Sequence, residues 1–210
     1  MTKLLGSLAL AGTLTGWLAL HLVMSLMVGV TTLQAEDCCW KQMQATGEEL
    51  FSRARYAEAQ RAFETALREA DKSNSKDSRR LQTLNSLANT FQKQGLPSQA
   101  NALYTQALDL LESHPEHDVA ANVLNNLAQL RSAEGRFAEA EVLYVRALGV
   151  QKRLFGERNP LFAITLDNLA MLQVSLGRYA EAEKNLCQAL EVSKKAGGAE
   201  HPQTLIKMNN

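Results

Sequence analysis

LNNLAQLRSAEGRFAEAEVLYVRAL, residues Leu124–Leu148, predicts two amphipathic helices joined by a tight turn at Gly135. Before the turn, four apolar residues recur at helical spacing and form one stripe: Leu124, Leu127, Ala128 and Leu130. Glycine has no Cβ to clash in the left-handed conformation that often follows a helix C-terminus. A second stripe after the turn combines small and aromatic residues: Phe137, Ala140, Tyr144 and Ala147. Because alanine lets helices approach closely, we expect a helical hairpin whose apolar side is too large to bury alone.

The same hairpin recurs along the chain. Segments similar to GRFAEA end at Ala59, Ala100, Ala140 and Ala182, which are separated by 41, 40 and 42 residues. An aromatic residue or leucine and a second alanine follow each of them at constant offsets. Upstream of the turns, LNSLA (84–88), LNNLA (124–128) and LDNLA (166–170) also match one another. Self-similarity at such a period predicts stacked repeats, each covering the apolar face of its neighbour.

These motifs resemble the tetratricopeptide repeat, and the period of 40 to 42 residues resembles its kinesin-light-chain-type variant. The resemblance implies an all-α solenoid, a right-handed superhelix of four hairpins with a partial fifth. Five positions depart from the pattern. Ala54 replaces the turn glycine in the first repeat, Pro97 replaces an aromatic residue, and Arg131 stands where an aromatic residue often lies. The first repeat also has Met43 and Gly47 in place of LNNLA, as a divergent terminal repeat can.

The repeat alignment divides the chain into segments. We expect repeats at about 39–77, 78–117, 118–159 and 160–201, with a partial repeat at 202–210, so that the repeat domain spans 39–210. The expected helices are 39–53, 56–72, 79–94, 97–113, 119–134, 137–155, 161–176 and 179–195. Pro160 and Pro202 occur where helices should begin, since proline suits the first helical turn. The C-terminal residues form the start of a further helix, either as a truncation or as an end left open for a partner or a second copy.

Residues 1–35 differ from the rest because Lys3 is the only charged side chain before Glu36. The apolar stretch is long enough for a membrane-spanning anchor, whereas Ala35 followed by Glu36 and Asp37 favours a cleaved signal peptide. In both cases Lys3 stays on the cytoplasmic side, which places the repeats outside the cytoplasm. The segment contains Gly12 and Gly16 at GxxxG spacing, which can pack membrane helices but also occurs by chance.

Three cysteines leave several interpretations open. Cys38 and Cys39 are adjacent, and Cys187 falls in the last full repeat, too far along the solenoid for an intrachain bridge. An odd number of cysteines in an oxidising compartment allows intermolecular pairing, and otherwise the thiols are free. A thiol-dependent activity at Cys38 and Cys39 is a weak alternative.

The first helix of each repeat lines the concave side of such a solenoid, and a binding groove is expected there. The residues expected to line it are polar and mostly uncharged: Asn85, Asn89, Asn122, Asn125, Asn126, Gln129, Asp167 and Asn168. Because an asparagine side chain carries both donors and acceptors, a row of them can pair with the backbone of an extended peptide. The family resemblance associates the positions of Asn126 and Asn168 with peptide binding, and Ser86 replaces the equivalent asparagine. Alternatively, these side chains bridge neighbouring turns or contact water.

Composition and motifs argue against other function classes. Lys plus Arg and Asp plus Glu both total 22, and no basic stripe is present beyond Arg79 and Arg80, which disfavours nucleic-acid binding. No glycine-rich phosphate loop, HExxH or GxSxG motif occurs. His114 and His117 lie near Glu116 and Asp118, but because equivalent loops have Asn159 or a lone His201, a helix start is favoured over a metal site. No enzyme activity, cofactor or metal is expected.

We therefore expect an exported, noncatalytic adaptor that binds a partner protein or extended peptide in the concave groove. The alternative is a self-assembling scaffold that associates through the C-terminal end or the N-terminal apolar segment.

Overall fold

A computed structural model describes residues 38–72, 76–113 and 118–197 as helices joined by short turns, with no strand in these ranges. A first helix spans 38–52. The others are α2 (Tyr56–Lys72), α3 (Lys76–Lys93), α4 (Pro97–Ser113), α5 (Ala120–Ala133), α6 (Phe137–Phe155), α7 (Pro160–Ser175) and α8 (Tyr179–Gly197). The predicted bounds of α2, α4 and α6 are confirmed. The prediction for α3 was three residues short at its N-terminus.

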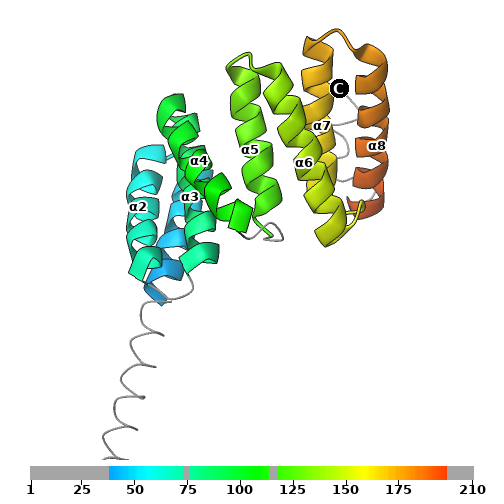
Figure 1. Ribbon diagram of the computed structural model, residues 1–210. Helices are drawn as coiled ribbons and strands as arrows, with labels where there is room; N and C mark the ends of the chain where they lie inside the picture. Colours follow the sequence, from blue (N-terminus) through cyan, green and yellow to red (C-terminus); the bar gives the residue numbers. More distant parts are fainter. Residues whose placement is uncertain (1–37, 73–75, 114–117, 198–210) are drawn as a thin grey trace, which may run out of the picture.

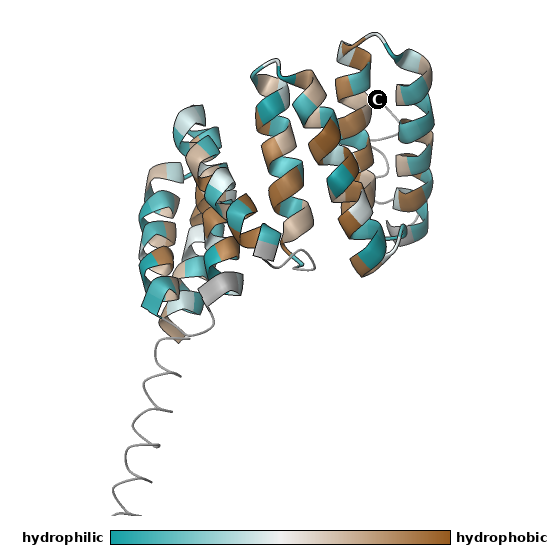
Figure 2. Cartoon of the chain, in the orientation of Figure 1, coloured by the Kyte–Doolittle hydropathy of each residue, from teal (hydrophilic) through white to brown (hydrophobic). Residues whose placement is uncertain are grey.

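Consecutive helices pair into four hairpins, which stand side by side in a curved row (Figure 1). The helices carry both hydrophilic and hydrophobic residues, as an amphipathic pattern requires (Figure 2). The main apolar core is continuous from Ala59 in the first hairpin to Leu172 in the fourth. The stacked all-α hairpins predicted from the sequence period are therefore confirmed.

The repeated alanines and aromatic residues form the core of each hairpin. Ala59, Ala100, Ala140 and Ala182 are at most 1% exposed. Phe63, Tyr104 and Tyr144 are at most 2% exposed and belong to the same apolar core. The predicted stripe before Gly135 is also buried, including Leu127 at 2% exposure. The helical register assigned from the sequence is therefore correct in this hairpin.

The turn of each of the four hairpins contains one residue in the left-handed conformation. Gly95, Gly135 and Gly177 have φ of 75°, 75° and 73°, and Ala54 takes the equivalent place with φ of 56°. After the turn glycine, the Arg136 amide donates to the carbonyl of Arg131 at 2.8 Å, which satisfies a backbone acceptor at the end of α5. Ala54 therefore adopts a conformation that its Cβ disfavours, and the first turn is more strained than the others.

The start of α7 confirms the role predicted for Pro160. Asn159 is the N-cap, and its side-chain oxygen accepts from the Leu161 amide at 2.8 Å. Pro160 then occupies the first turn, where its missing N–H costs no helical hydrogen bond. The histidines at 114, 117 and 201 lie outside the described residues.

Several sequence predictions fall on segments that the structure does not describe. They are the apolar segment 1–35, with its Gly12 and Gly16, and the partial fifth repeat at 202–210. Within residues 38–72, 76–113 and 118–197, none of the helices has the length and apolarity needed to cross a membrane.

Candidate functional site: the inner row of helices

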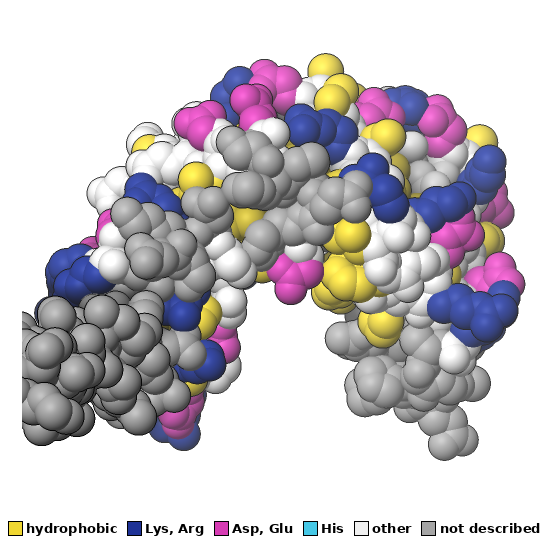
Figure 3. Space-filling model, turned by 60° about the horizontal axis from the view of Figure 1, so that its bottom comes forward, with side chains coloured by type: hydrophobic (Ala, Val, Ile, Leu, Met, Phe, Trp, Pro, Cys, Tyr) yellow, Lys and Arg dark blue, Asp and Glu magenta, His cyan; other side chains and the backbone are white. Residues whose placement is uncertain are grey.

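Helix 38–52, α3, α5 and α7 are the first helices of the four hairpins, and we call them the inner row. In a curved stack of helical hairpins, the first helices line the concave surface. The space-filling view shows the molecule as an arch over a hollow (Figure 3). Side chains from neighbouring inner-row helices contact one another directly, so the inner row is a continuous surface rather than separate ridges.

Four of the predicted groove residues form a hydrogen-bonded chain across three helices, which we call the amide ladder: Asn85, Asn126, Asn125 and Asn168. The Nδ2 of Asn126 donates to the Oδ1 of Asn85 on α3 at 3.0 Å. The Nδ2 of Asn168 on α7 donates to the Oδ1 of Asn125 at 3.0 Å. A longer contact of 3.4 Å joins Asn125 to Asn126 within α5. These bonds join residues more than 40 positions apart in the sequence and link α3, α5 and α7 to one another.

The ladder leaves hydrogen-bonding capacity unused. An asparagine amide has two N–H donors and two acceptor lone pairs. Asn126 donates one bond to Asn85 and accepts one from Asn125, so it retains one N–H and one lone pair. Asn85, Asn126 and Asn168 are half-buried, whereas Asn125 is only 8% exposed. The ladder bonds therefore hold three partly accessible amide groups in fixed orientations, and Asn125 acts mainly as the link between them.

The sequence analysis missed the part of this network that lies on the first helix. Gln44, only 3% exposed, donates from Nε2 to the Ser86 hydroxyl at 3.0 Å and to Glu48 at 2.9 Å. Its Oε1 accepts from the Thr83 hydroxyl at 3.2 Å. Ser86, the substitution that weakened the predicted asparagine row, therefore joins the first two hairpins. No LNNLA motif marks the first repeat, and only the repeat alignment of Gln44 with Asn85 could have indicated its role.

The other predicted groove residues have different roles. Asn89 accepts a 2.6 Å hydrogen bond from the hydroxyl of Tyr104, and it ties α3 to α4 of its own hairpin. Burial raises the pKa of the Tyr104 phenol, so this donor keeps its proton at neutral pH. Asn122 and Asp167 are half-buried, and Gln129 is exposed. Gln129 is therefore the most accessible of the predicted set, and Asn89 is committed to a structural bond.

A small pocket opens between the first two inner-row helices. It has a volume of about 120 Å³ and is lined by Glu48 and Phe51 of the first helix, Phe63 of α2, and Ser86 and Asn89 of α3. This volume is below the roughly 300 Å³ typical of small-molecule sites. The pocket is large enough to hold a portion of one side chain. This size suits a surface that binds a peptide better than a site that encloses a small metabolite.

Reactive groups do not gather on this surface. Cys38, Cys39 and Cys187 are free thiols, with Cys38 and Cys39 at the start of the first helix and Cys187 on α8. Within the described ranges, no three His, Cys, Asp or Glu side chains come together as metal ligands. The arrangement offers neutral donors and acceptors for binding, not a nucleophile beside a base.

Comparison with known proteins identifies the repeats. The family model described as tetratricopeptide repeat matches residues 47–113 and 119–195. No curated protein matches the chain.

Among solved structures, BtubC (BKLC) from P. vanneervenii is 23% identical with a TM-score of 0.70, covering 80% of this chain and 69% of that one. A putative kinesin light chain with nearly identical TPR-like repeats from Podosopora anserina is 21% identical with a TM-score of 0.65, covering 80% and 81%. PilF of Pseudomonas aeruginosa is 21% identical with a TM-score of 0.63, covering 83% and 68%. These structures share the fold, and the family match shows that this chain belongs to the tetratricopeptide repeat family.

Proposed function

We propose that this chain is a noncatalytic adaptor that binds an extended segment of a partner protein along the inner row, outside the cytoplasm. Tetratricopeptide solenoids are typical protein-binding scaffolds with extended concave surfaces. The observation that carries the proposal is the amide ladder across α3, α5 and α7. It presents neutral donors and acceptors in a row, and those groups match the repeating N–H and C=O groups of an extended backbone.

The orientation of the ladder supports binding as well as stability. An amide that is already hydrogen-bonded to its neighbour loses little conformational freedom when a ligand binds. Asn126 is held by Asn85 and by Asn125, so its remaining donor and acceptor are preorganised. A peptide bound this way is recognised mainly through its backbone, and its side chains contribute less to selectivity.

Backbone recognition can be tested with selected peptides. A displayed library of random peptides would be screened against the full-length chain, and the affinities of the selected sequences measured by calorimetry. We expect little side-chain consensus, and we expect N-methylation of two central peptide amides to weaken binding about tenfold or more, since each methyl group removes a backbone donor.

The matched variants are Asn126→Ala with Asn168→Ala, which removes the ladder, and Gln106→Ala on the exposed surface of α4 as a control. The ladder variant should bind at least tenfold more weakly, and the control should bind as the wild type does. Equal binding by the ladder variant, or indifference to N-methylation, would refute backbone recognition by the ladder.

The proposed location rests on Lys3, the only charged side chain before Glu36, and on the mostly apolar or small residues 4–30 that follow it. Intact mass and membrane fractionation of the expressed full-length chain test it. A mass that begins at Glu36 in the exported soluble fraction indicates a secreted adaptor, and a full-length mass in the membrane fraction indicates a tethered one. Repeats that are protected from an external protease in intact cells with a permeable outer envelope would contradict both forms.

A further inference from the structure

The inner row changes in character at α7. Residues three or four apart on a helix lie on one face, so each inner-row helix has one residue on either side of its ladder position. On α5 these flanking residues are Asn122 and Gln129, on either side of Asn126. In the repeat alignment their equivalents on α7 are Ile164 and Met171, which we call the apolar pair. Apolar side chains therefore replace the amides beside the ladder at α7.

The other two inner-row helices are polar at both flanking positions. Helix α3 has Gln82 and Asn89, and the first helix has Lys41 and Glu48. Among the four described inner-row helices, charged residues therefore flank the ladder level at one end, amides flank it in the middle, and apolar residues flank it on α7. A ligand that lies along the whole row meets apolar flanking residues at one end only.

Packing does not explain the apolar pair. Met171 is 54% exposed, Ile164 is half-buried, and neither belongs to an apolar core cluster of the described residues. The exposure of Met171 does not follow from the place of α7 in the row. Gln129, at the equivalent position, is exposed although α3 lies on one side of its helix and α7 on the other. A helix that carries apolar residues on its outer face as well as in the core is expected where a ligand covers that face.

The apolar pair is continuous with the amide ladder. Asn168 lies four residues after Ile164 and three before Met171, so all three share one face of α7. The side chain of Asn168 is held by its bond to Asn125 at 3.0 Å. A peptide backbone that reaches Asn168 must therefore pass between the two apolar side chains.

The geometry of an extended chain determines which of its residues meet the apolar pair. Successive side chains of a strand point to opposite faces, perpendicular to the direction of its backbone N–H and C=O groups. When these groups face Asn168, the side chains of two consecutive residues point along α7 in opposite directions. One of them is directed toward Ile164 and the next toward Met171.

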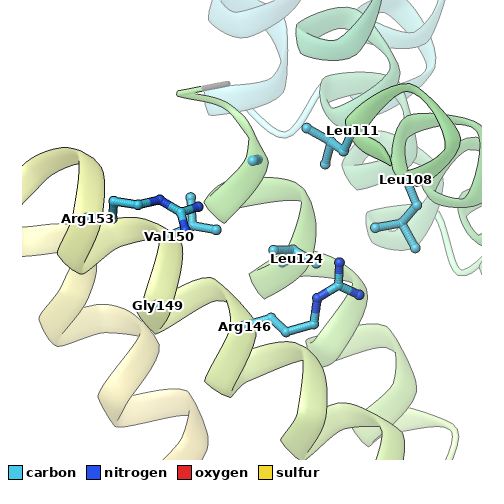
Figure 4. Close-up of a pocket in the computed structure, with 8 residues that line it drawn as sticks. Leu108, Leu111, Leu124, Arg146, Gly149, Val150 and Arg153 are labelled. Atoms are coloured by element: carbon cyan, nitrogen blue, oxygen red, sulfur yellow. The ribbon is translucent and has the colours of Figure 1, made fainter. Parts of the chain in front are cut away.

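Another apolar site lies away from the inner row. It is a pocket of about 300 Å³ whose lining includes Leu108 and Leu111 of α4, Leu124 of α5 and Val150 of α6 (Figure 4). Leu124 lies two residues before Asn126, and residues two apart on a helix are rotated by about 200° and point in nearly opposite directions. A peptide that bonds to the ladder therefore does not reach this pocket, which serves below as a control site.

We infer that the partner segment has two consecutive large apolar residues at the end that lies over α7, and polar residues over α3 and α5. This inference rests on the proposed function and specifies the partner of the inner row. Packed helices lie about 8–10 Å apart and an extended chain advances about 3.3 Å per residue, so about three residues span each helix. The flexible side chain of Met171 adapts to different shapes, so large apolar residues of several kinds fit. The limited side-chain consensus of selected peptides is then confined to these two residues.

The test uses the full-length chain and a blocked, fluorescein-labelled peptide, Ser-Gln-Thr-Ser-Gln-Thr-Leu-Leu, whose binding is followed by fluorescence anisotropy. The reversed sequence is measured as well, because a strand can lie along the row in either direction, and the tighter of the two is the leucine peptide. Its matched serine peptide has both leucines replaced by serine. We expect the serine peptide to bind the wild-type chain about tenfold or more weakly, since two apolar side chains are no longer buried.

The main variant is Ile164→Asn with Met171→Gln, which gives α7 the flanking residues that α5 already has. It should bind the leucine peptide about tenfold or more weakly and the serine peptide within about twofold of the wild type. Circular dichroism checks that the variant is folded. The control variant is Gly149→Glu, which adds a side chain to the lining of the pocket in Figure 4 and should bind both peptides as the wild type does.

The ladder variant, Asn126→Ala with Asn168→Ala, separates this inference from the proposed function, because it should weaken both peptides by a similar factor. If it weakens both while the α7 variant still prefers the leucine peptide, the inference is wrong and the ladder proposal stands. If it weakens neither, the proposed function is wrong. Weaker leucine-peptide binding by Gly149→Glu would assign the leucines to the other pocket and overturn the inference.

Two further measurements examine other occupants of the apolar pair. Sedimentation compares the self-association of the wild-type chain and the α7 variant, and a loss in the variant would assign the pair to a second copy. A chain that lacks residues 198–210 is titrated with the leucine peptide, and binding about tenfold tighter would assign the pair to the end of this chain. Either result would contradict the inference, whereas unchanged self-association and unchanged affinity support it.

Discussion

The first and third hairpins build the same structure from different residues. In the third, Ala128 and Tyr144 are both buried in the main core, and the turn residue is Gly135. The first has Gly47, Phe63 and Ala54 at the equivalent positions. In the first hairpin a Cβ on Gly47 would lie 2.5 Å from the Phe63 ring, so the ring occupies the space that a methyl group fills elsewhere. In the first hairpin the sizes of Gly47 and Phe63 are therefore matched to each other.

The two hairpins also differ in what covers them. Leu127 of the third hairpin is 2% exposed because the second and third hairpins share one core. The equivalent residue of the first hairpin is Thr46, which is exposed and whose hydroxyl donates to the carbonyl of Gln42 in its own helix. A leucine in the LNNLA motif is thus a contact between hairpins, whereas the first hairpin has a polar threonine at this position.

Truncating the side chains of Leu127 and Thr46 to alanine is expected to give the largest difference in stability between the two hairpins. Leu127→Ala should lower the free energy of unfolding by about 2–5 kcal/mol, since it leaves a cavity in the shared core. Thr46→Ala should change it by less than about 0.5 kcal/mol because the site is exposed. Chemical denaturation of the full-length variants measures both. A cost below about 0.5 kcal/mol for Leu127→Ala would contradict the assigned core.

Gly47→Ala should come next, with a loss of about 1–3 kcal/mol, because its Cβ would overlap the Phe63 ring. The loss should shrink in a Phe63→Leu background, which reproduces the alanine and leucine pair of the fourth hairpin, Ala170 and Leu186. Gly149→Ala is the control, because its Cβ meets nothing, and it should stabilise α6 by about 0.5–1 kcal/mol. If both glycine variants change the free energy of unfolding in the same direction, helix propensity and not the close approach to Phe63 determines the effect.

Exchange of the turn residues should give a smaller effect with opposite signs. Ala54→Gly should raise the free energy of unfolding by about 1 kcal/mol, since φ is 56° at this position. Gly135→Ala should lower it by a similar amount, about 1 kcal/mol. Thermal unfolding of the two variants provides the measurement. A destabilised Ala54→Gly variant would mean that the Ala54 methyl group makes a contact that stabilises the fold by more than its positive φ costs.

The tyrosines should add a difference that is visible only at alkaline pH. Burial raises the pKa of Tyr104 and also the pKa of Tyr144. Their protonated phenols therefore favour the folded state fully below the unfolded pKa of about 10, and this contribution is lost as the pH rises above it. The first hairpin has Phe63 instead. Tyr144→Phe should raise the pH of half-unfolding above that of the wild type, as followed by circular dichroism, and a lowered value would contradict the assignment.

Periodicity explains why so much of the fold could be predicted. Each hairpin has the same amphipathic pattern and the same turn, so the start of α6 at Phe137 follows directly from Gly135 and the stripe around Tyr144. The inner row was predictable for the same reason. The identity of its residues follows from the helical register of LNNLA, which a local pattern determines.

The roles of individual polar residues could not be predicted in this way. The bond between Asn125 and Asn168 depends on how two hairpins are placed, and a repeat pattern does not specify that placement. Arg131 stands where aromatic residues are common, yet it is 9% exposed and donates to Asn101 of α4 at 2.6 Å and to Glu134 at 2.9 Å. The buried guanidinium is tolerated because these partners accept its hydrogen bonds. Asn101 is 30 residues away in the sequence, so its proximity to Arg131 depends on how the helices pack.

The central claim is that the amide ladder contacts the backbone of a bound peptide. Side-chain NH₂ resonances of asparagine, followed by NMR as a library-selected peptide is titrated into the full-length labelled chain, test it most directly. We expect the resonances of Asn85, Asn126 and Asn168 to shift together and to saturate at the same peptide concentration. Asn185, whose Nδ2 bonds to Gln173 away from the ladder, should not change. Shifts at Asn185 or near Gly149 with an unchanged ladder would place the peptide elsewhere and contradict the account.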